Sequence, residues 1–172
     1  MNGLEQVTDI LEELYRHGWD ERNGGNLSYI LTEEEVKQVC DINNVIREFK
    51  YDFDLSSLIG KYFIITGTGK YFRNCKKDPE TNLGIMKVKD EHTLSLLWGY
   101  KDGGRPTSEA PTHLKCHIDR LKVDADHRLV IHCHPTNIIC MTHICPLDSN
   151  YFTEVLWKMQ TESIVVFPEG LS

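Results

Sequence analysis

The spacing of apolar and charged residues predicts that strands and helices alternate along the chain. In residues 4–16, apolar side chains recur at intervals of three and four with charged residues between them, which is typical of an amphipathic helix. A sharp turn is expected at 23–26, where glycine and asparagine cluster, and the chain then becomes extended. A short helix should follow within 31–39, with Thr32 as its N-cap.

Further elements are predicted from apolar and β-branched segments. Strands are expected within 61–72, where the strand runs into a glycine-rich turn, and at 85–89, 93–100, 128–134 and 163–170. Helices are expected at 107–122, 135–144 and 150–160. We expect the strand 128–134 to be buried. No repeat, low-complexity segment or shift in composition marks a boundary, so the pattern predicts one mixed α/β domain over residues 1–172.

Composition narrows the classes of partner. The chain has 172 residues, 40% of them hydrophobic, and a formal net charge of -7. Nucleic acid and anionic membranes select basic surfaces, so we expect neither as a partner, whereas a small anionic substrate is compatible with a few local donors. Residues 1–6 contain no basic residue, and no apolar stretch approaches the roughly 18 residues of a membrane span. The expected location is the cytoplasm.

The six cysteines predict reduced thiols. They stand at 40, 75, 116, 133, 140 and 145, without a Cys-x-x-Cys pair or an export signal. Cysteine is often buried, so packing is the expected role.

A His-x-His pair is the sharpest local signal of chemistry. His132 and His134 lie at the end of the apolar segment VIHCH. Side chains alternate along a strand, so both imidazoles should point to one side and Cys133 to the other, into the core. Two imidazoles on one rigid strand suit zinc. The alternative interpretation is a pair of hydrogen-bonded core histidines.

Three polar segments are further candidates. Thr107, Ser108 and Glu109 open a predicted helix, where they would either cap it or place a carboxylate base near a metal. The loops 23–26 (NGGN) and 67–70 (GTGK) could wrap amides and hydroxyls around a phosphate, although most such loops are only turns. Neither loop matches a nucleotide-binding pattern.

Together these segments carry a resemblance that none establishes alone. The chain resembles the class II aldolase and epimerase family, which includes the adducin head domain, and within it most the L-rhamnulose-1-phosphate aldolases. The segments that carry it, in family order and spacing, are GWDERNGGNLS, ITGTGKYFRN, NLGIMKV, LWG, PTSEAPTH, VIHCHPTN and TESIVVFPEG. The resemblance runs from about Gly18 to the last residue, and is looser over 29–61.

The resemblance implies a fold and a reaction. The fold is a mainly antiparallel sheet flanked by helices in three layers. The reaction is the zinc-dependent retro-aldol cleavage of a phosphorylated keto sugar by a lyase of rhamnose degradation, with one Zn²⁺ per subunit. His132 and His134 would bind zinc, and Glu109 would be the acid/base. The phosphate pocket would comprise Asn23, Asn26, Thr68, Gly69, Thr107 and Ser108, with Thr68 where the family often has serine.

The resemblance also concerns assembly and completeness. Glu162 stands where the family reaches a neighbouring subunit's active site, which implies a second catalytic carboxylate and a homotetramer. A catalytic zinc usually has three protein ligands, and the family's third histidine lies beyond residue 172. His113 is the best internal substitute, but the resemblance makes it no ligand. We therefore expect a fragment with an incomplete metal site and an uncovered apolar face.

Alternative functions stay open at this point. Another sugar-phosphate aldolase or a pentulose-phosphate 4-epimerase would share the zinc pair and differ in the aldehyde pocket. A non-catalytic scaffold like the adducin head would not need His132, His134 and Glu109. A zinc hydrolase would not need two loops suited to phosphate.

Overall fold

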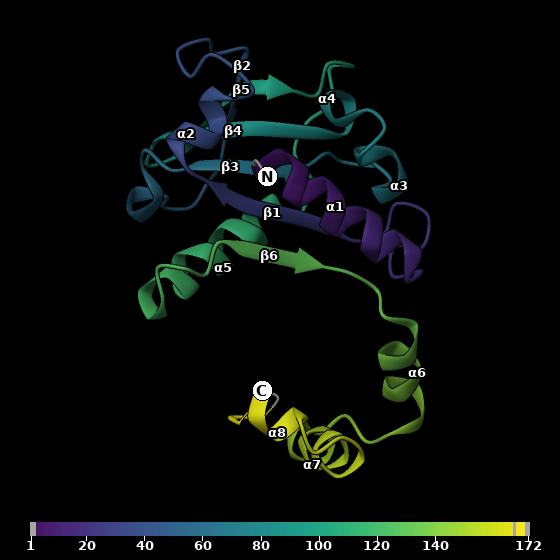
Figure 1. The fold of residues 1–172 in the computed structure, drawn as a ribbon. Helices are drawn as coiled ribbons and strands as arrows, with labels where there is room; N and C mark the ends of the chain where they lie inside the picture. Colours follow the sequence, from purple (N-terminus) through teal and green to yellow (C-terminus); the bar gives the residue numbers. More distant parts are fainter. Residues whose placement is uncertain (1–2, 167, 171–172) are drawn as a thin grey trace. The chain divides into compact units, whose positions relative to one another are not determined.

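The computed structural model describes residues 3–166 and 168–170 (Figure 1). The chain divides into a first unit, Met1–His134, and a second unit, Pro135–Ser172, and each is described by itself. Among the described residues, none of the helices combines the length and apolar character needed to cross a membrane.

The first unit is built on one six-stranded sheet in which every neighbouring pair is antiparallel. The strand order is β2-β5-β4-β3-β1-β6. The strands are β1 (Asn26–Leu31), β2 (Arg47–Lys50), β3 (Tyr62–Thr66), β4 (Leu83–Asp90), β5 (Thr93–Gly99) and β6 (Leu129–His132). The predicted α/β class with a mainly antiparallel sheet is confirmed.

The described part of the first unit contains five α-helices and one 3₁₀ helix. They are α1 (Gly3–Arg16), α2 (Glu33–Lys37), the 3₁₀ helix η1 (Ser56–Leu58), α3 (Phe72–Cys75), α4 (Pro79–Asn82) and α5 (Ala110–Val123). The prediction for Thr32 is confirmed, because its side chain accepts from the Glu35 amide and the Glu35 carboxylate accepts from the Thr32 amide.

Two apolar cores lie on opposite faces of the sheet. Val7, Leu11 and Leu14 of α1 pack on one face with alternate residues of β1, β3 and β4. Leu114 of α5 packs on the other face, against the intervening residues of the same strands. This alternation follows from the two-residue period of a strand and yields helix, sheet and helix layers. Figure 1 shows α1 lying across the sheet.

Three expectations for the first unit need correction. The strand predicted at 128–134 is β6, which is not buried: Leu129 is 38% and Ile131 37% exposed, because β6 is an edge strand and, among the described residues, pairs with β1 alone. The helix expected from residue 107 begins at Ala110. The edge strand β2 was not predicted, because its charged residues outnumber its one apolar side chain, Phe49.

The second unit contains three helices in its described part. They are α6 (Thr136–Ile144), α7 (Ser149–Met159) and α8 (Ser163–Val166). The helices predicted at 135–144 and 150–160 are confirmed. The strand predicted at 163–170 is wrong over its described first half, which forms α8; Phe167 lies outside the described residues. The Val165 and Val166 amides donate to the Glu162 carbonyl at 3.0 and 3.1 Å, and no strand pairs with this segment among the described residues.

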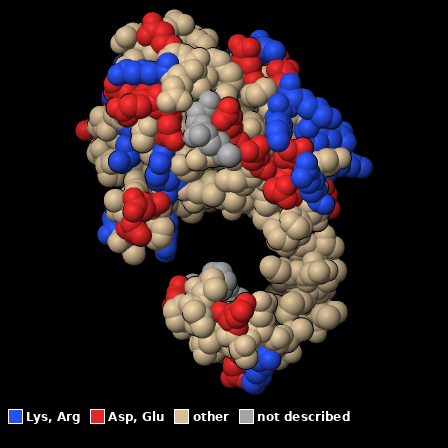
Figure 2. Space-filling view, viewed as in Figure 1, with Lys and Arg blue, Asp and Glu red and all other residues tan. Residues whose placement is uncertain are grey.

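Apolar side chains are widely exposed on the second unit. None of the described residues of its helices is buried, and Ile144, Leu147, Met159 and Val165 are 78% to 82% exposed. In the view of Figure 2, charges of both signs are interspersed over the first unit, whereas the second unit presents a mostly uncharged face.

Candidate active site

The predicted site residues lie at one end of the sheet, where β1 begins and its two neighbouring strands end. β1 begins at Asn26, and its antiparallel neighbours β3 and β6 end at Thr66 and His132. Asn26 is the cross-strand partner of His132. The Leu27 amide donates to the Thr66 hydroxyl at 3.0 Å and fixes β1 against β3 at this edge.

The imidazoles of His132 and His134 converge. Their Nε2 atoms are 3.2 Å apart and their ring centroids 4.9 Å apart. His134 lies beyond the end of β6, so it is held by a loop contact instead of the sheet: its amide donates to the Trp19 carbonyl at 2.7 Å. A Cβ at Gly24 would lie 2.8 Å from His134 Nδ1, and one at Gly25 2.7 Å from the His132 carbonyl oxygen. Only glycine allows the 23–26 loop to approach this closely.

The separation of these nitrogens fits a shared zinc ion. Zn–N distances of about 2.0–2.1 Å with tetrahedral angles place two imidazole nitrogens roughly 3.3 Å apart. The observed Nε2–Nε2 distance is 3.2 Å. Within residues 3–166 and 168–170, no group of three or more His, Cys, Asp or Glu side chains is arranged to hold a metal. The residues thus fit two positions of a zinc site.

Glu109 contacts Nδ1 of His132, on the other side of the ring from the Nε2 atom that faces His134. Its Oε2 lies 2.7 Å from His132 Nδ1, and both side chains are about two-fifths exposed. A proton on Nδ1 donated to this carboxylate leaves Nε2 with a lone pair, the arrangement typical of metal-binding histidines. Glu109 is the N-cap of α5 and makes no side-chain cap bond; its amide donates to Thr107 Oγ1 at 3.3 Å.

The polar groups predicted to bind phosphate differ in whether they already make hydrogen bonds within the protein. The Thr68 amide donates to the Arg105 carbonyl at 2.9 Å, and its hydroxyl donates to the Pro106 carbonyl at 2.6 Å. The Thr68 hydroxyl would therefore have to rotate before it could donate a hydrogen bond to an anion. Gly69 is exposed with φ of 70°, and Asn23 and Ser108 are also exposed.

Buried polar residues beneath the site were not predicted from the sequence as part of it. Ser28 of β1 lies between His113 and His117 of α5, at 2.8 Å from His113 Nδ1 and 2.8 Å from His117 Nε2. His113 Nε2 is hydrogen-bonded to Asn26 Oδ1, so both nitrogens of His113 are used inside the protein. Burial lowers the pKa of each histidine to about 4. The i,i+4 spacing of the two histidines was the available signal.

The six cysteines and Glu162 lie outside the group of residues described above. All six cysteines lie in the described part of the chain and are free, as predicted. Cys133 packs against the core beneath α1, and burial raises the pKa of its thiol. Glu162 belongs to the second unit, where it is exposed in the turn before α8.

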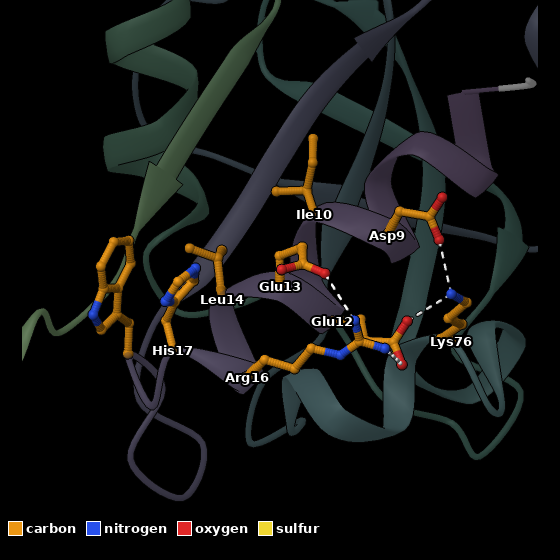
Figure 3. A pocket seen from close by; sticks show the side chains of 9 residues that line it. Asp9, Ile10, Glu12, Glu13, Leu14, Arg16, His17 and Lys76 are labelled. Atoms are coloured by element: carbon orange, nitrogen blue, oxygen red, sulfur yellow. Dashed lines mark hydrogen bonds and ion pairs between the residues drawn. The ribbon is translucent and has the colours of Figure 1, made fainter.

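A groove along α1 is separate from these residues. It has a volume of about 540 Å³ and is lined mainly by charged side chains (Figure 3). Lys76 contacts Asp9 at 3.0 Å and Glu12 at 2.6 Å, and Arg16 contacts Glu12 at 3.2 Å. The hydrogen bond from Lys76 lowers the pKa of Glu12. Both basic side chains of the groove are paired with acidic ones, and none of the predicted site residues lines it.

Several curated proteins are similar to this chain in sequence. Rhamnulose-1-phosphate aldolase from Listeria monocytogenes is 49% identical to this chain over 169 residues, covering 98% of this chain and 62% of the relative. The enzymes of that name from Enterococcus faecalis and Mannheimia succiniciproducens are 46% and 41% identical, with 61% and 60% of their lengths covered. The chain therefore spans about three-fifths of the length of these curated relatives.

A solved structure and a family model extend the comparison. The crystal structure of a sugar-phosphate aldolase from Thermotoga maritima superposes with a TM-score of 0.78 at 25% identity, covering 97% of this chain and 67% of that one. The model of the class II aldolase and adducin N-terminal domain matches residues 5–170. Nearly the whole chain is matched in both cases, and the chain belongs to the class II aldolase and adducin family.

Proposed function

We propose that this chain provides the metal and phosphate sites of a lyase that reversibly cleaves L-rhamnulose 1-phosphate into dihydroxyacetone phosphate and L-lactaldehyde. The observation that carries the proposal is the convergence of His132 and His134 at 3.2 Å beside the Glu109 carboxylate, at one edge of the sheet. The names of the relatives supply the substrate.

The reaction sets the tasks of the residues. In the cleavage direction the bond between C3 and C4 breaks, the C4 hydroxyl loses its proton as it becomes the aldehyde, and C3 gains a proton. His132 and His134 would hold zinc, which as a bound Lewis acid stabilises negative charge on the oxygens of the dihydroxyacetone phosphate half. Glu109 is proposed to move the proton at C3, since its carboxylate is next to His132 and about two-fifths exposed.

Neutral donors are proposed to bind the phosphate. Asn23, Asn26, Thr68, Thr107 and Ser108 would supply amide and hydroxyl groups, with the Gly69 amide beside them. Such donors position an anion without a dedicated lysine, which agrees with a chain of net charge -7.

The metal site depends on more than these two ligands. A catalytic zinc usually has three protein ligands, so we expect residues 1–172 alone to bind zinc weakly and to show little activity. We further propose a homotetramer in which Glu162 reaches the active site of a neighbouring subunit as a second catalytic carboxylate.

The deciding experiment is a cleavage assay on the complete gene product. Dihydroxyacetone phosphate released from L-rhamnulose 1-phosphate is measured with and without added zinc, beside zinc content per subunit. The matched control is His132→Ala, which removes one ligand and should lose both zinc and activity. Conversion of a pentulose phosphate without release of dihydroxyacetone phosphate would replace this proposal with an epimerase. Stoichiometric zinc without turnover of either substrate would refute both.

A further inference from the structure

A row of buried polar groups runs from the interior to the edge of the site. His117 Nε2 is 2.8 Å from Ser28 Oγ, Ser28 Oγ is 2.8 Å from His113 Nδ1, and His113 Nε2 is bonded to Asn26 Oδ1. These four residues are between 0% and 5% exposed. Water therefore does not compete for their hydrogen bonds, and each group must be satisfied by its neighbours.

Each neutral histidine carries one proton, so the row can run in only two directions. In the outward direction, His117 donates to Ser28, Ser28 donates to His113 Nδ1, and His113 Nε2 donates to the Asn26 carbonyl oxygen. In the inward direction every bond is reversed and the Asn26 amide group is flipped. A mixed arrangement would place two hydrogens or two lone pairs against each other, or would have Ser28 accept from both histidines and leave its buried hydroxyl hydrogen without an acceptor among the described residues.

The inner end of the row decides between the two directions. His117 Nδ1 is buried and has no hydrogen-bond partner among the described residues. In the outward direction this atom is an unprotonated acceptor, whereas in the inward direction it is a buried N–H without an acceptor. Unpaired buried N–H groups are rarer in proteins than under-used acceptors, so the outward direction is favoured.

The outward direction determines what Asn26 offers to the site. Its oxygen is taken by His113, so its NH₂ group faces the edge of the sheet. Asn26 Nδ2 is 3.4 Å from His132 Nδ1, but that nitrogen is only 2.7 Å from the Glu109 carboxylate and donates to it. The hydrogens of Asn26 are thus left for an acceptor atom of a ligand.

We propose that His117 is a positioning residue which, through Ser28 and His113, holds Asn26 with its NH₂ group toward the ligand. The identity of that ligand, a sugar phosphate, rests on the proposed function; the direction of the row does not. Burial, which lowers the pKa of His117 to about 4, keeps the imidazole neutral near pH 7. The row then selects acceptor oxygens over donor groups at this point of the site.

The tautomers of His113 and His117 report the direction of the hydrogen-bonded row without any activity measurement. Long-range ¹H–¹⁵N spectra of the ¹⁵N-histidine-labelled chain should show His113 and His117 both protonated at Nε2 and unprotonated at Nδ1. Assignment comes from His113→Gln and His117→Gln. Protonation of either residue at Nδ1 in the unmodified chain would overturn the proposal.

Ligand binding tests the consequence in the complete gene product. His117→Leu removes the N–H that begins the row, whereas His117→Gln retains an N–H donor. We expect His117→Leu to raise the KM for L-rhamnulose 1-phosphate, and the Kd for dihydroxyacetone phosphate, by about threefold to tenfold, the effect of one hydrogen bond. The kcat should change less than the KM, and His117→Gln should recover most of the loss.

The results of these experiments distinguish the positioning role of His117 from the proposed function. Wild-type KM and Kd in a folded His117→Leu variant would overturn the positioning role. If the unmodified protein neither binds dihydroxyacetone phosphate nor cleaves the sugar phosphate, the proposed function fails. The direction of the row is then decided by the tautomers alone.

Discussion

Acidification from pH 7.5 to pH 5.0 should destabilise the first unit through two buried histidines. His113 and His117 are 2% and 0% exposed, and burial lowers the pKa of each from 6.5 to about 4. The folded state therefore favours the neutral imidazole. Each histidine contributes stability that is fully present above about pH 6.5 and is lost as the pH falls toward 4.

The magnitude follows from the two pKa values of each group. At pH 5.0 the unfolded chain is almost fully protonated at these histidines while the folded chain is mostly not, which costs about 2 kcal/mol for each residue. The sum for both is about 4 kcal/mol, a large part of the stability of an ordinary domain. Carboxylates with lowered pKa, such as Glu35 beside Arg128, lose their contribution only at lower pH.

Urea unfolding followed by tryptophan fluorescence would measure this effect. The free energy of unfolding is determined at several values between pH 7.5 and 5.0 for the unmodified chain and for His117→Gln, which cannot titrate. We expect the variant to show a smaller loss on acidification by about 2 kcal/mol. His143→Gln, at an exposed position of α6, is the matched control and should keep the full pH dependence. Equal pH dependence in all three proteins would refute the reasoning.

Four further substitutions test the site and its scaffold. Glu109→Gln should keep the fold and the zinc but lower kcat by about 10² to 10⁴, and near-normal proton exchange of dihydroxyacetone phosphate would exclude the acid/base role. Asn23→Ala and Thr68→Ala should mainly raise the KM for the sugar phosphate; an unchanged KM in both would remove them from the phosphate site. Gly25→Ala should cost at least about 1–2 kcal/mol in urea unfolding, because φ is 90° and the new Cβ would lie 2.7 Å from the His132 carbonyl oxygen. Wild-type stability would show that the loop can move away.

The sequence predicted the elements whose signals are local. α1 was found from its apolar spacing, and α2 from Thr32 as its N-cap, because capping and amphipathic patterns act within one helix. The apolar segments that became β3, β4 and β5 are central strands, so their composition reflects burial on both faces.

The predictions that were wrong concern segments whose structure depends on residues distant in the sequence. The segment SIVV has strand-like composition, but β propensity largely reflects packing against neighbouring strands, and α8 has none among the described residues. The apolar composition of β6 suggested burial, yet burial depends on whether other elements cover a strand. Nothing in the segment itself shows that β6 pairs on one side only.

The convergence of His132 and His134 was predicted from the sequence, whereas the buried hydrogen-bond network beneath them was not. The His132-x-His134 spacing predicted two imidazoles on one side, and their Nε2 atoms do meet, although the strand ends at His132. His113 was considered only as a substitute metal ligand, and His117 was not assigned to the site, because a helical i,i+4 pair has many uses. Their role became visible only with Ser28, which the register of β1 against β6 and β3 places between them.

The edge position of β6 links the stability of the sheet to ligand binding. His132 is carried by a strand with one neighbour, so backbone pairing with β1 is its main support, and the Asn26–His132 register is the last pair before the chain leaves the sheet. The buried row holds Asn26 by a hydrogen bond from His113, and Gly24 and Gly25 permit the 23–26 loop to lie close to the His134 ring and the His132 backbone. A metal that binds only the folded arrangement would stabilise this edge in proportion to the logarithm of its concentration over Kd. Of the two edge strands of the sheet, β6 is therefore the one that ligand binding would stabilise.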